Sequence, residues 1–233
     1  MGWRDWLGLS KDVEQERPRP GRLLMPSRRF YQETFPEASL TPAKLVSLLR
    51  QFNGGDLEAG FELAEHLEAM DGHLLSIAQK RRGAVTRLPW SVVSASQVHS
   101  VDNPGMADEA AAYCDEVLQS LESLPGALAH LSLAIGRNLA VAELVWESSA
   151  DGLRLEAIEP VEFSRLVVDS RGEQPHLRIR TAEDWTWGVP LVASKFVVHV
   201  SNSGASLPHR GGLLSVTARL CLIKSYAVKD WTT

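Results

Sequence analysis

Residues 139–157, with the sequence LAVAELVWESSADGLRLEA, carry the strongest fold signal of the chain. Leu144 and Trp146 belong to a period of two that is typical of a strand, which places both side chains on one face. The polar segment 148–152 has the composition of a turn, and the chain then returns through a second alternating run. These residues therefore predict an antiparallel β-hairpin.

Further strand signals follow this hairpin. Residues 163–168 and 177–181 flank a turn at 169–172 and predict a second hairpin. Residues 195–200 predict another strand, and a loop rich in Ser and Gly over 201–212 leads into a final helical pattern.

Helical patterns come before the first hairpin. Thr41 and Pro42 have the residue types of an N-cap and a first helical position, and the Gly-rich segment 53–55 ends this helix. Asp56 is expected to cap a second helix, which Asp71-Gly72 breaks or kinks midway. Its apolar face is expected to contain Leu57, Phe61, Ala64, Leu67, Met70, Leu74, Ile77 and Ala78.

The opposite face of this second helix is acidic, and it is expected to be solvated. Its members are Glu58, Glu62, Glu65, Glu68 and Asp71. Basic residues follow toward the end of the same pattern, in the order that the helix dipole favours.

The next stretch mixes both patterns. Residues 88–93 predict a short strand with Trp90 in the core, and helices are expected over 107–121 and 128–136. Helices first and hairpins afterwards favour an α+β fold with a carboxy-terminal helix over a doubly wound sheet. The expected division is an arm at 1–40 and a domain at 41–233, which is helical over 41–137, β-rich over 138–202 and helical again over 212–231.

The arm is rich in proline and locally basic. Up to Phe30 it contains seven basic and four acidic residues. Prolines interrupt any regular period, while several large apolar side chains suggest that the arm docks on another surface. A terminus that contacts nothing is the alternative.

Composition excludes several classes of protein. The 233 residues are 44% apolar and 23% charged, which is ordinary globular usage, and the formal net charge of −5 is too mild to indicate nucleic-acid binding by itself. Two cysteines are too few for a disulfide framework, so a reducing compartment is expected. The chain shows neither a signal peptide nor an apolar run long enough for a membrane span, so a soluble protein with no membrane partner is expected.

Catalytic patterns are sparse. Glu62, His66 and His73 have spacings that could serve a metal, but Gly72 interrupts their helix, so no metal is expected. His199 lies near Ser201 and could begin a hydrolase site, although strand alternation favours a structural histidine. No catalytic residue and no cofactor are therefore assigned.

The final helical pattern has an apolar face that requires a partner, either in its own domain or in another subunit. Its members are Leu213, Val216, Leu220, Ile223, Ala227 and Trp231. Arg219, Lys224 and Lys229 lie at separate angles, so they form no single basic stripe. Trp146 is expected in the core, and Trp185 and Trp187 are either core residues or interface anchors.

The order of short motifs resembles the portal-protein family of Mu-like phages and prophages, chiefly its amino-terminal portion. The first block consists of Gly55-Asp56-Leu57, Phe61-Glu62-Leu63, Met70-Asp71-Gly72-His73-Leu74, Arg81-Arg82 to Val85, Leu88-Pro89-Trp90, Gly136 and Glu143-Leu144-Val145-Trp146-Glu147. The second block consists of Phe163-Ser164-Arg165-Leu166, Lys195-Phe196-Val197-Val198-His199, Arg210-Gly211-Gly212-Leu213 and Lys224-Ser225-Tyr226 to Asp230-Trp231. Portal chains of this family are expected to continue into stem, clip and crown segments beyond the wing-like part seen here.

The resemblance implies a structural virion protein rather than an enzyme. Such proteins form a head-to-tail ring, typically of twelve subunits, at one vertex of the phage head. DNA enters through the ring, and terminase, capsid and head-completion proteins attach to it. Assembly is expected in the bacterial host cytoplasm. Contact with double-stranded DNA is expected to lack sequence specificity. A small hydrolase, using His199 or the group of Glu62, His66 and His73, and a sequence-independent nucleic-acid-binding module stay open as alternatives.

Two sets of residues follow from this interpretation. The candidate contacts with a neighbouring subunit or DNA are Arg17, Arg19, Arg22, Arg28, Arg29, Arg210, Arg219 and Lys224. The residues that match family motifs and are expected to be structural are Gly55, Asp56, Trp90, Trp146, His199, Gly211, Gly212 and Trp231.

Overall fold

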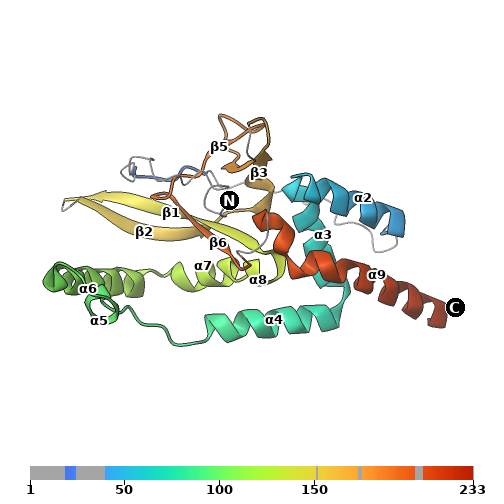
Figure 1. Ribbon diagram of the computed structural model, residues 1–233, viewed down its shortest axis with the longest axis horizontal. Helices are drawn as coiled ribbons and strands as arrows, with labels where there is room; N and C mark the ends of the chain where they lie inside the picture. Colours follow the sequence, from blue (N-terminus) through green and yellow to red (C-terminus); the bar gives the residue numbers. More distant parts are fainter. Residues whose placement is uncertain (1–18, 25–39, 151, 173–174, 203–206, 233) are drawn as a thin grey trace.

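A computed structural model describes residues 19–24, 40–150, 152–172, 175–202 and 207–232 of the chain. It shows an elongated α+β arrangement with two small antiparallel sheets, and in Figure 1 the helices lie below and to the right of the strands. The predicted fold class is therefore confirmed. Helix α6 lies at one end of the long axis and the end of helix α9 at the other (Figure 1).

The first helices begin and end where the sequence predicts. Helix α2 spans Pro42–Asn53, and the Thr41 side chain accepts a hydrogen bond from the backbone N–H of Lys44. Helix α3 spans Leu57–Met70, with Asp56 as its N-cap. The break at Asp71 is complete, because its carboxylate caps a separate helix α4 at Gly72–Thr86.

Helix α4 and the residues after it differ from the sequence prediction. Every residue of α4 is described and none is buried, so Ile77 does not continue the apolar face of α3. Residues 88–93, also described throughout, form no strand, and Trp90 is 48% exposed rather than in the core. A Pro and an apolar run in sequence cannot create a strand without a neighbouring strand for its hydrogen bonds.

Helix α6 at Pro104–Ser120 confirms the helix predicted over 107–121. The single helix predicted over 128–136 is instead two, α7 at Leu124–Leu131 and α8 at Ala134–Arg137, and the short helix α5 at Ala95–Val98 was not predicted. Asn138 then adopts a left-handed conformation with φ of 66°, which turns the chain from α8 into the first strand.

The first sheet has the order β2-β1-β6. Strand β1, Leu139–Ser149, pairs antiparallel with β2, Gly152–Pro160, and with β6, Phe196–Val200. The hairpin predicted at 139–157 is thus confirmed. Its register shifts between Val145 and Trp146, so the pairing contains a bulge.

The second sheet has the order β3-β4-β5. Its strands span Leu166–Asp169, His176–Ile179 and Val189–Pro190, and a 3₁₀ turn at Phe163–Arg165 precedes them. The second predicted hairpin is confirmed, while the two-residue strand β5 was not predicted. Trp185 and Trp187, just before β5, are exposed, so the interpretation as core residues is wrong.

The main core lies between α2, α3 and the two sheets. Its largest members include Phe52, Phe61, Leu139, Leu166 and Ile179. Phe52 meets Phe61 edge to face with ring centroids 5.7 Å apart. A second cluster joins α2 and α3 to helix α9, Leu213–Thr232.

A prediction follows from the contact between α2 and α3. A Cβ atom at Gly60 would lie 1.9 Å from the Phe52 ring, so Gly60→Ala must displace a buried aromatic side chain. We expect a loss of about 1–3 kcal/mol of folding free energy in urea denaturation. Gly83→Ala in the interior of α4, where the nearest atoms are at ordinary contact distance, is the matched control and should be neutral or stabilising. Equal effects of both substitutions would contradict this account.

Candidate functional site

Part of the amino-terminal arm is docked on the first sheet. Residues 19–24, here called the strap, run beside β1, where the Gly21 backbone N–H donates to the Trp146 carbonyl at 2.7 Å. Arg22 forms an ion pair with Glu159 of β2 at 2.9 Å. Both of these side chains are partly exposed, so the pair adds little stability. The expectation that the arm docks on a surface is confirmed for the strap.

A buried carboxylate holds the strap in place. Glu143 of β1 is almost fully buried and accepts hydrogen bonds from the backbone N–H groups of Leu23 and Leu24, the latter at 3.1 Å. Lys195 lies 3.4 Å from the same carboxylate and also donates to the Gly21 carbonyl. The only sequence signal for this arrangement is an acidic residue inside the apolar run of β1.

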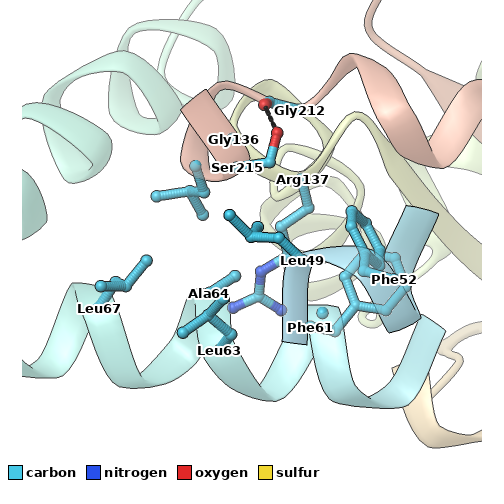
Figure 2. Close-up of a pocket in the computed structure, with 12 residues that line it drawn as sticks. Leu49, Phe52, Phe61, Leu63, Ala64, Leu67, Gly136, Arg137, Gly212 and Ser215 are labelled. Atoms are coloured by element: carbon cyan, nitrogen blue, oxygen red, sulfur yellow. Dashed lines mark hydrogen bonds between the residues drawn. The ribbon is translucent and has the colours of Figure 1, made fainter. Parts of the chain in front are cut away.

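The motif Arg210-Gly211-Gly212 lies where three segments meet. A Cβ at Gly212 would be 2.9 Å from the Gly136 carbonyl oxygen, so glycine is required for this close approach. Figure 2 shows Gly212, Arg137 and side chains of α3 around a small cavity of about 20 Å³, which has room for about one water molecule. The Ser215 hydroxyl donates to the Gly212 carbonyl at 2.6 Å and closes the first turn of α9 (Figure 2).

Arg137 is buried at this junction. Its guanidinium lies 4.6 Å from the centre of the Phe163 ring and 3.4 Å from the Glu65 carboxylate. Burial lowers the pKa of Arg137, and Glu65 and Glu68 oppose that shift.

The acidic face of α3 is not simply solvated, contrary to the sequence prediction. Glu68 and His66 are buried, and Glu68 forms an ion pair with Arg82 of α4. Arg82 makes the burial of Glu68 possible, and it lies 14 residues further along the chain on a different helix.

His209 is fully buried next to the end of α2. Its ring lies 5.3 Å from the Phe52 ring, edge to face. Burial lowers the pKa of His209 to about 4, and the nearby Arg210 acts in the same direction. Arg210 itself donates to the Asn53 carbonyl at 3.0 Å and so satisfies the carboxy-terminal end of α2.

Those predicted cationic contacts that the structure describes do not gather into one surface. Three of them already bond within the chain. Arg22 pairs with Glu159, Arg210 donates to the Asn53 carbonyl, and Lys224 pairs with the Asp71 carboxylate at 2.9 Å. Arg219 is exposed on α9, and Arg19 belongs to the strap. The remaining candidates, Arg17, Arg28 and Arg29, lie outside the described residues.

Of the other motif residues, Gly55, Asp56 and Trp146 make contacts within the described part of the chain, whereas Trp231 does not. Gly55 has φ of 107° and packs against Val168, and Asp56 caps α3. The Trp146 indole N–H donates to the Ser194 carbonyl at 2.8 Å. Its side chain is only half-buried and belongs to none of the core clusters, so the prediction that it lies in the core is wrong. Trp231 is 92% exposed.

The catalytic alternatives gain no support from the geometry. His199 contacts the Leu131 carbonyl through Nδ1 at 2.9 Å, as a structural histidine does. His66 is buried on α3, whereas His73 is exposed in the first turn of α4. Within the described ranges, no group of three or more His, Cys, Asp or Glu side chains is placed to hold a metal ion.

An open pocket of about 420 Å³ lies between the α3–α4 junction and α9. Leu67, Met70 and Leu222 supply apolar walls, and the Lys224–Asp71 ion pair lies at its edge. Cys221 also borders it, and burial raises the pKa of that thiol.

No described helix is long and apolar enough to cross a bilayer.

Helix α9 buries only one of its two apolar faces. Ala218 and Leu222 pack into the second core cluster, and Leu214 is buried beside Gly136. The face predicted to require a partner is exposed instead: Leu213, Val216, Leu220, Ile223, Ala227 and Trp231. The structure describes no segment that covers this face, so its partner is not in the described part of the domain.

Comparison with known proteins shows the family to which this chain belongs. The chain belongs to the family described as the portal protein of Mu bacteriophage, which matches residues 61–233. It is 27% identical over 208 residues to the Mu-like prophage FluMu protein gp29 of Haemophilus influenzae, which covers 89% of this chain and 39% of that protein. The portal protein of Escherichia phage Mu is 25% identical over 228 residues, covering 97% of this chain and 43% of that protein. The family resemblance is confirmed, and the chain spans about two fifths of the length of these relatives.

The Glu143 contacts generate a prediction about the strap. Glu143→Gln keeps the shape but removes the charge that pairs with Lys195 and replaces one acceptor of a strap N–H by an amide donor. We expect a loss of about 2–4 kcal/mol of folding free energy and faster tryptic cleavage after Arg22. Glu147→Gln on the exposed end of the same strand is the control and should change neither measurement. Unchanged cleavage in the Glu143 variant would refute the role of this carboxylate.

The burial of His209 predicts a pH dependence. Its pKa is about 4 in the folded protein and about 6.5 in the unfolded chain, so the unfolded state binds the proton more tightly. The contribution of His209 to the free energy of unfolding is therefore fully present above about pH 6.5. It falls by up to about 1.4 kcal/mol per pH unit as the pH decreases toward 4. Denaturation at a series of pH values should show this slope, and His209→Gln should reduce it. An identical slope in both proteins would contradict the assignment.

Proposed function

We propose that this chain acts as the wing-like part of a phage portal and associates with copies of itself around double-stranded DNA. The observation that carries the proposal is the exposed apolar face of α9 in a chain that belongs to the Mu portal family. An apolar stripe of this length is a contact surface rather than ordinary protein exterior. A ring requires two different contact surfaces on each subunit, because every copy meets one neighbour on each side.

Subunit contacts also explain the charge distribution better than DNA binding does. Arg22, Arg210 and Lys224 have acceptors within the chain. Arg219 and the arm residues Arg17, Arg19, Arg28 and Arg29 are the proposed contacts with a neighbour or with DNA. A conduit must let DNA slide, so its DNA contacts are weak, electrostatic and independent of sequence.

The further partners in this proposal are those of a portal. They are terminase, capsid and head-completion proteins. The chain itself forms a ring of twelve subunits at the head vertex. Assembly takes place in the bacterial host cytoplasm, and the ring ends up in the virion. The role is structural, with no enzymatic step and no cofactor.

Association can be measured directly on the 233-residue chain. Sedimentation velocity over a range of protein concentrations, with negative-stain imaging of the largest species, should show self-association and closed or curved assemblies. A strict monomer at high concentration would contradict self-association of this chain. DNA binding should be weak, should not distinguish sequences and should weaken steeply as salt is added.

A further inference from the structure

The exposed face of α9 forms one continuous stripe. Its residues, here called the α9 stripe, are Leu213, Val216, Leu220, Ile223, Ala227 and Trp231, at spacings of three and four. Leu220 is 65% exposed and Ile223 is 64% exposed. Arg219 is exposed on the border of this stripe. A helix that exposes this much apolar surface is stabilised by a partner that covers it.

Helix α6 carries a second and different stripe. Met106, Glu109, Tyr113 and Glu116 share one face of the helix, at spacings of three and four, and are here called the α6 stripe. Met106 is 66% exposed and Tyr113 is 57% exposed, while both glutamates are also exposed. The two apolar groups thus alternate with two carboxylates on a free helix face.

The charged groups at the two stripes are opposite in sign, and the stripes lie far apart on the same molecule. Glu109 and Glu116 belong to the α6 stripe, and α6 contains neither Lys nor Arg, whereas Arg219 borders the α9 stripe. In Figure 1, α6 lies at one end of the long axis and α9 extends to the other. One copy therefore cannot bring its own stripes together, but two copies placed end to end can.

We propose that the α9 stripe of one copy packs on the α6 stripe of the next copy. This inference rests on the proposed self-association and names its two surfaces. Leu220 and Ile223 cover Met106 and Tyr113, and Arg219 approaches the carboxylates of Glu109 and Glu116. Because the two surfaces differ, each contact leaves one free α6 stripe and one free α9 stripe for the next copies, as a head-to-tail assembly requires.

The apolar part of the contact is tested by substitutions on exposed positions. Leu220→Ser/Ile223→Ser and, separately, Met106→Ser/Tyr113→Ser should each raise the dissociation constant of self-association at least tenfold in sedimentation velocity. Leu88→Ser is the matched control, because Leu88 is also 65% exposed but belongs to neither stripe. Circular dichroism should show all variants folded, since none of these side chains is buried.

The pairing of the two stripes is tested by reversing their charges. Arg219→Glu and Glu109→Lys/Glu116→Lys should each weaken association of the variant with itself at low salt. Combining the three substitutions in one chain, or mixing the two variants in equal amounts, should restore association, because each α9 then finds an α6 of the matching charge. A head-to-tail contact predicts rescue in both experiments.

The outcomes separate this inference from the proposed function. An oligomer that ignores both sets of substitutions overturns the pairing and leaves self-association intact. An oligomer that is sensitive at α9 but not at α6 shows that another surface covers α9 and also overturns the pairing. A wild-type chain that stays monomeric overturns the self-association on which the pairing rests.

Discussion

The guanidinium of Arg137, buried at the end of α8, constrains how the helices meet both sheets. Removing this charge from water costs several kcal/mol unless partners compensate. The Phe163 ring before the second sheet and the Glu65 carboxylate of α3 supply that compensation. Because Asn138 turns directly from this arginine into β1, the same contacts fix where the first sheet begins.

Local sequence signals predicted the elements that depend on neighbouring residues. Thr41 and Asp56 cap their helices, Asp71 separates α3 from α4, and the alternation after Leu139 produces a hairpin. Each of these features is complete within a few residues of the chain. The physical cause is therefore visible in a short stretch of sequence.

Features that depend on distant partners were not predictable in this way. Residues 88–93 have a strand-like composition but no partner strand, and Glu68 is buried because Arg82 of another helix neutralises it. The role of Glu143 depends on a strap about 120 residues away in sequence. The α9 stripe was predictable as a surface that needs a partner, whereas only the packing of Leu214, Ala218 and Leu222 shows that its own domain uses the opposite face.

The strap has a consequence for the order of folding. Lys195, which contacts both Gly21 and Glu143, is made 174 residues after Gly21. Contacts of such long sequence separation form slowly because closing the loop between them costs entropy. During synthesis the strap must therefore wait until β1 has been made, and its contact with Lys195 forms only as strand β6 is added to the sheet.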